Sequence, residues 1–93
     1  MQIEEQLIAE FKPFINRGNL DGLIYIWNEY YSETEYERQV AWDYVFQKIY
    51  LHAALKKQKG ICTWLDGVFL QFNEMTQIAL RQMFPYARHL LNK

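Results

Sequence analysis

Apolar residues recur every three or four positions along most of this chain, which is the spacing of one face of an α-helix. The first such stripe consists of Ile3, Leu7, Ile8 and Phe11. It predicts a helix from about Gln2 to Phe11. Pro13 predicts a break or kink there, because proline lacks a backbone N–H and disfavours helix at the residue before it. The alternative is a final turn in which Phe14 and Ile15 continue the same apolar side. Gly18 then suits the left-handed position that follows many helices.

A second stripe begins at Leu20 and ends near Tyr31, and it includes Leu23, Ile24 and Trp27. Asn19 has the residue type of a helix N-cap, because its side-chain oxygen can accept a hydrogen bond from the first turn. Asp21 then lies where the positive end of the helix dipole favours an acid. Together these residues predict a helix that stops near Tyr31.

A long third helix is predicted from about Glu33 to Gln58, since no Gly or Pro interrupts this range. Its start is indicated twice, because Ser32 with Glu35 and Thr34 with Glu37 have capping-box spacing. The helix is apolar on almost every side, which is typical of a helix surrounded by others. We therefore expect it at the centre of the fold.

Gly60 separates this helix from a predicted fourth, whose inward face holds Ile61, Leu65, Val68, Phe69 and Phe72. Asn73 is the expected cap of a fifth helix with an inward side of Met75, Ile78, Ala79, Met83 and Phe84. Pro85 interrupts it before a last segment, Tyr86 to Leu91. The whole pattern predicts one all-α domain over residues 1–93: a compact bundle of about five helices, built from two helical hairpins plus a C-terminal helix.

The two hairpins share an internal similarity at an offset of 38 residues, Gly22–Asn28 against Gly60–Asp66. A helical-hairpin repeat would produce it, because each hairpin buries one face against the next. Within the first hairpin, Gly18-Asn19-Leu20-Asp21 followed by Leu23 and Ile26 resembles the turn into the second helix of ankyrin-like repeats. The resemblance covers about ten residues, and the chain has no Thr-Pro-Leu-His run. It implies a non-enzymatic protein-binding scaffold of degenerate type, as in many viral proteins with divergent repeats.

The aromatic content is high for so small a domain, with seven Tyr, six Phe and three Trp in 93 residues. Each ring carries roughly 150–250 Å² to bury, more than one small core easily holds, so we expect a partner surface. Tyr and Trp bind well while tolerating water. The predicted partner contacts are Tyr25, Tyr30, Tyr31 and Tyr36. The alternative is that these rings cover the domain's own core.

The net charge of −1 is unevenly distributed. Residues 1–47 hold nine acids and three bases, a net charge of −6, and residues 48–93 hold seven bases and two acids, a net charge of +5. The halves either pair internally or leave the molecule with one basic end. The basic end suggests an alternative function, a small nucleic-acid-binding or transcription-regulating protein, with contacts through Lys56, Lys57, Lys59, Arg81 and Arg88.

No residue pattern predicts catalysis, a metal site or a cofactor. The two histidines, His52 and His89, are far apart in the sequence, and Cys62 has no paired cysteine. Glu33, Glu35 and Glu37 are explained by a helix N-terminus, where acids oppose the dipole. We expect Cys62 to be a buried, inert thiol. The chain is therefore expected not to be an enzyme.

The remaining sequence features concern location and partners. No apolar stretch reaches the roughly 20 residues of a membrane span, and the N-terminal residues lack the basic region of a secretory signal. A single cysteine fits a reducing compartment, the cytoplasm or nucleus. The favoured function is a non-catalytic protein–protein interaction module or small assembly subunit, which binds another protein or a second copy of itself and no membrane.

Overall fold

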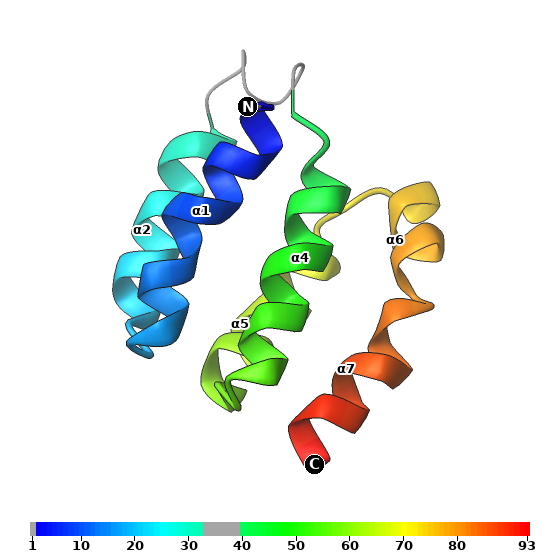
Figure 1. Cartoon of the computed structure of the whole chain (residues 1–93). Helices are drawn as coiled ribbons and strands as arrows, with labels where there is room; N and C mark the ends of the chain where they lie inside the picture. The colour runs from blue at the N-terminus through cyan, green and yellow to red at the C-terminus, as the bar shows by residue number, and fades with distance from the viewer. Residues whose placement is uncertain (1, 33–39) are drawn as a thin grey trace.

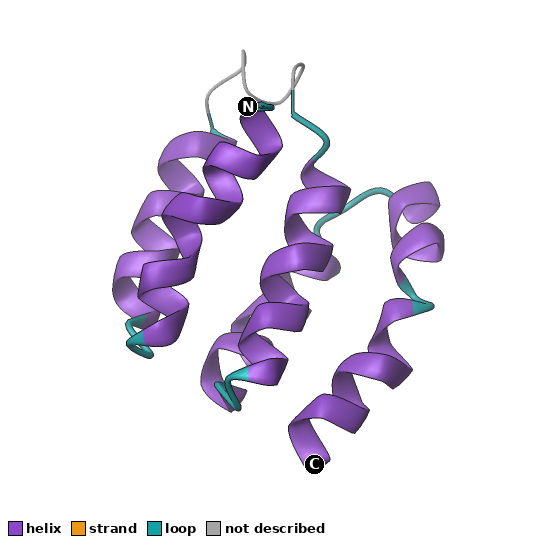
Figure 2. Cartoon of the chain, in the orientation of Figure 1, coloured by secondary structure: helices purple, strands orange, loops and turns teal. Residues whose placement is uncertain are grey.

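The computed structural model describes residues 2–32 and 40–93, and the regular structure of these residues is helical throughout (Figure 2). The described helices are α1 (Ile3–Asn16), α2 (Leu20–Tyr31), α4 (Trp42–Leu55), α5 (Lys59–Phe69), α6 (Glu74–Leu80) and α7 (Met83–Asn92). The predicted all-α class is confirmed. The described residues form six helices rather than about five, because the C-terminal segment divides into α6 and α7.

Three helices lie side by side, with α4 between α1 and α7 (Figure 1). α2 packs against α1, and α5 packs against α4, so these four helices form two hairpins. α4 contributes the largest share of the core, and its fully buried side chains are Val45, Phe46, Ile49, Ala53 and Ala54. α4 is therefore the central helix, enclosed by α1, α5 and α7.

α4 is shorter than the predicted helix from Glu33. Val40 and Ala41 are not helical, and the helix begins at Trp42. The Ala41 N–H donates a 3.0 Å hydrogen bond to Glu4 Oε2 in α1, which satisfies this donor outside a helix. α4 thus begins where α1 supplies a carboxylate.

The predicted cap at Ser32 and the end of the third helix also differ from the structure. Ser32 is the C-terminal cap of α2. Its partner Glu35 and the whole Thr34–Glu37 box lie outside the described residues. At its other end α4 stops at Leu55, because Lys57 has a φ of 61° in the left-handed region.

Proline and glycine end fewer helices than predicted. Pro13 lies inside α1, which continues to Asn16 because the fully buried Ile15 extends the apolar stripe. Pro85 lies in the first turn of α7, where a backbone N–H has no intrahelical partner. Gly60 lies in the first turn of α5, which begins at Lys59, so this glycine does not separate the two helices.

The predicted inward face of the fifth helix is wrong for most of α6. Met75 is 81% exposed and Ile78 is 54% exposed. The contact with the residues before α6 is instead a hydrogen bond, which Gln77 Nε2 donates to the Phe72 carbonyl at 2.8 Å. α6 therefore buries Leu80 in the core and leaves an apolar outer side.

The two hairpin turns are built alike. Gly18 has a φ of 67° in the first turn, and Lys57 has a φ of 61° in the second. Asn19 N–H donates to the Phe14 carbonyl at 2.8 Å, and Gln58 N–H donates to the Ala53 carbonyl at 2.9 Å. α1 spans residues 3–16 and α4 spans residues 42–55. Each position of the second hairpin is therefore 39 residues after its equivalent in the first.

The predicted offset of 38 residues is therefore one residue short, because it matched Gly22 to Gly60. These glycines have different roles. A Cβ on Gly22 would lie 2.6 Å from Cδ1 of Phe14, so Gly22 allows α1 and α2 to approach closely. A Cβ on Gly60 would meet nothing within 4 Å.

A groove between α5 and α7

A groove of about 480 Å³ lies between α5 and α7 over the surface of α4. α4 supplies Tyr50, α5 and its end supply Lys59, Cys62, Thr63, Asp66, Phe69 and Leu70, and α7 supplies Phe84, Arg88 and Leu91. Its volume lies in the range of ligand-binding clefts. Most of these side chains are apolar, and Lys59 and Arg88 add two cations.

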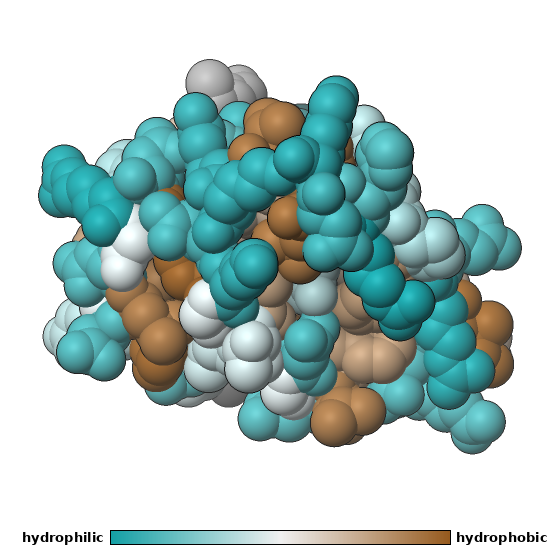
Figure 3. Space-filling model, turned by 90° about the horizontal axis from the view of Figure 1, so that it is seen from below, coloured by the Kyte–Doolittle hydropathy of each residue, from teal (hydrophilic) through white to brown (hydrophobic). Residues whose placement is uncertain are grey.

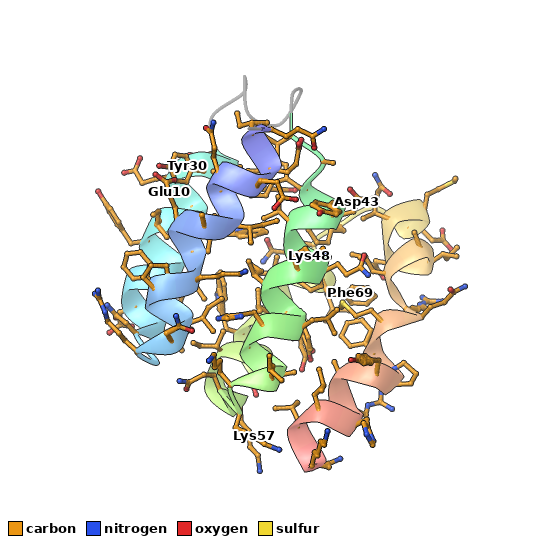
Figure 4. The ribbon with its side chains drawn as sticks, viewed as in Figure 1. Glu10, Tyr30, Asp43, Lys48, Lys57 and Phe69 are labelled. Carbon is orange, nitrogen blue, oxygen red and sulfur yellow. The ribbon has the colours of Figure 1, made fainter. Side chains whose placement is uncertain are left out.

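Two contacts hold α7 beside this groove. At one end the rings of Phe69 and Phe84 meet edge to face with centroids 4.9 Å apart. At the other end Lys57 Nζ donates a 2.8 Å hydrogen bond to the carbonyl of Leu90 near the C-terminus of α7 (Figure 4). A cation there also opposes the helix dipole. The groove is therefore bounded at both ends by fixed contacts.

Two polar groups of the groove, the Tyr50 hydroxyl and the Cys62 thiol, stay protonated near neutral pH. The Tyr50 hydroxyl donates a 2.7 Å hydrogen bond to Asp66 Oδ1. Burial raises the pKa of Tyr50, and the bond to Asp66 raises it further. Burial also raises the pKa of the Cys62 thiol to about 11, with a smaller contribution from Asp66. Neither side chain is a nucleophile under these conditions.

The side of α5 that lines the groove is equivalent to a side of α2 that is covered by α5 in the first hairpin. Trp27 of α2 is 3% exposed, and its ring meets that of Trp64 in α5 edge to face at 6.1 Å. The equivalent residue, 39 positions later, is Asp66, which is exposed and lines the groove. Likewise Tyr31 packs against Trp42, whereas its equivalent Leu70 is 70% exposed. In the first hairpin α5 covers this side of α2. No further helix among the described residues covers the equivalent side of α5 in the second hairpin.

The predicted partner-binding tyrosines are separated by the structure. Tyr25 is 67% exposed on the outer side of α2, and its pKa is raised, mainly by a hydrogen bond to Glu29. Tyr30 and Tyr31 are half-buried against the core, and Tyr31 stacks on Trp27 with centroids 5.6 Å apart. Tyr36 lies outside the described residues. Two of the four rings therefore cover the domain's own core.

The predicted nucleic-acid contacts are also divided. Lys59 and Arg88 lie in the groove, and Lys57 caps α7. Lys56 is the exposed C-cap of α4, and Arg81 is the exposed C-cap of α6. The structure therefore brings two of the five cations into one site and uses a third for packing.

Sequence reasoning missed most of the groove residues. Leu70, Phe84 and Leu91 read as members of amphipathic stripes, and nothing local distinguishes them from buried residues. The internal repeat was the available signal, since a hairpin at the end of a repeat array leaves one side uncovered.

A second hollow, of about 510 Å³, lies on another face and is lined by Tyr44, Lys48, His52, Tyr86 and six other residues. His52 Nε2 lies 2.7 Å from Asn16 Oδ1. Partial burial lowers the pKa of His52, and Lys12 and Lys56 lower it further. Tyr44 bonds Glu5 at 2.7 Å, so the polar groups here already serve to join α1 to α4.

Metal-binding clusters and membrane spans are not found in the part of the chain that the structure describes. Within it, no three His, Cys, Asp or Glu side chains are grouped to hold a metal ion. None of the described helices is long and apolar enough to cross a membrane. Seen from the end with the hairpin turns and the C-terminus, the surface shows separate apolar areas between polar side chains (Figure 3).

Comparisons with protein-family models, with curated proteins and with solved structures found no match to the chain. The resemblance to ankyrin-like repeats therefore stays a prediction.

Proposed function

We propose that this chain is a non-catalytic protein–protein interaction module, and that it binds an α-helix of its partner in the groove between α5 and α7. One observation carries the proposal. The side of α5 that lines the groove is equivalent to the side of α2 that another helix covers, yet it is open, with Leu70 70% exposed.

The lining suits an amphipathic helix. Such helices place apolar side chains every three or four residues into a hydrophobic groove. Phe69, Leu70, Phe84 and Leu91 supply an apolar surface. Lys59 and Arg88 outnumber the carboxylate of Asp66, and this net positive charge favours a partner helix that carries carboxylates beside its apolar face.

The same residues argue against the alternatives. The thiol of Cys62 stays protonated at neutral pH, and Asp66 already accepts a bond from Tyr50, so neither is prepared for catalysis. Nucleic-acid binding depends on many phosphate contacts, and the groove offers two cations. Protein binding is therefore the function that we favour over the nucleic-acid alternative.

A selection experiment tests the proposal. A displayed library of helical peptides is panned against the chain, and binding of the enriched peptides is measured for two variants. Leu70→Glu places a charge in the groove, while Met75→Glu places one on the exposed side of α6. We expect a loss of at least tenfold in affinity for Leu70→Glu and an unchanged affinity for Met75→Glu.

The result that would overturn the proposal is equally concrete. Peptides that bind both variants equally well would place the binding surface elsewhere. Failure to enrich any peptide, together with salt-sensitive binding of an oligonucleotide, would favour the nucleic-acid alternative.

A further inference from the structure

The outer side of α2 carries an acidic stripe. Asp21, Tyr25 and Glu29 are spaced four residues apart, so they share one face of the helix. All three are exposed, and the nearby Glu29 raises the pKa of the Tyr25 hydroxyl. This stripe presents one large ring between two carboxylates.

The acidic stripe and the groove lie on different sides of the molecule. α2 and α7 are at opposite edges of the layered structure in Figure 1, with α4 between them. The two sites differ in charge, because Lys59 and Arg88 outnumber the Asp66 carboxylate in the groove, whereas the stripe holds two carboxylates. This separation prevents the stripe of one molecule from reaching its own groove.

We propose that the groove receives the acidic stripe of α2 from a second copy of this chain, an inference that rests on the proposed function. The Tyr25 ring enters the apolar part of the groove, beside Leu70 and Phe84. The carboxylates of Asp21 and Glu29 pair with the cations of Lys59 and Arg88. Asp21 and Glu29 are eight residues apart, about 12 Å along the helix at 1.5 Å per residue, so each carboxylate pairs with a separate cation.

The contact joins different surfaces of the two copies, so it is heterologous. A bound pair leaves one free stripe on one copy and one free groove on the other, and assembly continues into a chain or closes into a ring. Screening by salt should weaken the contact, because its pairs are partly exposed.

Light scattering coupled to size-exclusion chromatography measures the assembly at high protein concentration. We expect an apparent mass well above the 11.3 kDa monomer at low salt and a fall towards it at about 0.5 M salt. A monomer at every concentration and salt level would overturn the inference.

Charge reversal identifies the surfaces. The groove variant Lys59→Glu with Arg88→Glu, and the stripe variant Asp21→Arg with Glu29→Arg, should each be monomeric, because stripe and groove then carry like charges. An equimolar mixture should assemble again, since each groove meets a stripe of opposite charge. Arg81→Glu is the matched control, an exposed cation outside the groove, and should assemble like the unchanged chain. Circular dichroism of each variant verifies folding.

The outcomes separate this inference from the proposed function. Assembly that survives both reversals, or a mixture that stays monomeric, would overturn the α2 contact. If the chain is monomeric but helical peptides still bind at Leu70, the interaction module stands and its partner is a different protein. If neither is seen, both proposals fail.

Discussion

Tyr50 and Asp66 join α4 to α5 beneath the groove through a hydrogen bond of 2.7 Å between the phenol and Oδ1. Tyr50 is buried, while Asp66 is exposed, so the bond lies at the boundary between core and solvent. It fixes the orientation of both helices at the site where a partner helix is proposed to bind.

Tyr50→Phe should therefore lower the free energy of unfolding by about 1 kcal/mol, the usual net value of such a bond. Asp66→Asn should cost less, because an amide still accepts a hydrogen bond. Urea denaturation of Tyr50→Phe, of Asp66→Ala and of the variant that combines these two substitutions gives the coupling between the two side chains. Strictly additive effects would show that the bond contributes nothing to stability.

Phe46 is the test of the core. It is fully buried in α4, and its ring meets that of Phe72 edge to face at 5.4 Å. Phe46→Ala should reduce the free energy of unfolding by about 3–5 kcal/mol through lost burial and a cavity. Met75→Ala, at an exposed position on α6, should change it by less than about 0.5 kcal/mol. A similar small change for both in thermal denaturation would contradict the central position of α4.

Lys57 has a strained backbone, and its side chain holds the C-terminal end of α7. Its left-handed φ disfavours any residue other than glycine, while its amine holds the end of α7. Lys57→Gly and Lys57→Met both remove the amine, but only the glycine relieves the backbone. We expect Lys57→Gly to be more stable than Lys57→Met by about 1 kcal/mol in urea denaturation. Equal stability of the two variants would mean that the backbone is unstrained.

The reactivity of the Cys62 thiol measures how far water and reagents enter the groove. Because burial raises its pKa to about 11, very little thiolate is present near pH 7.5. We expect a disulfide reagent such as dithiobis-nitrobenzoate to modify the folded chain far more slowly than the urea-unfolded chain. Equal rates would show that the thiol is exposed and that the bottom of the groove is open to water.

His52 makes stability depend on pH. Its pKa is lowered in the folded chain, chiefly by burial and then by Lys12 and Lys56. Below about pH 6.5 the unfolded chain therefore binds a proton that the folded chain resists, and this contribution to stability falls as the pH falls. His52→Gln keeps a donor for Asn16 and removes the titration. Its unfolding free energy should decrease less than that of the unchanged chain between pH 7.5 and 5.5.

Features determined by one nearby side chain could be predicted from the sequence. Asn19 caps α2 by accepting a 3.0 Å bond from Gly22 N–H, and Asn73 caps α6 by accepting one of 2.9 Å from Thr76 N–H. The left-handed Gly18 was predictable for the same local reason. The positions of these turns, and with them the all-α class, follow from short-range chemistry.

Features that depend on distant contacts could not be predicted. The start of α4 is determined by Glu4, 37 residues before Ala41. Tyr31 and Leu70 occupy equivalent positions in similar stripes, but only Tyr31 has a neighbouring helix to cover it. The groove is therefore a property of how the hairpins associate, and single-helix periodicity does not contain that information.

The turn geometry also has a consequence for the order of folding. Each hairpin closes within a few residues, at Gly18 or at Lys57, so its loop-closure entropy is small. The bond from Ala41 to Glu4 closes a loop of 37 residues and orders much more chain. We expect the two hairpins to form early and independently, with the docking of α4 against α1 as the slower step that completes the native state.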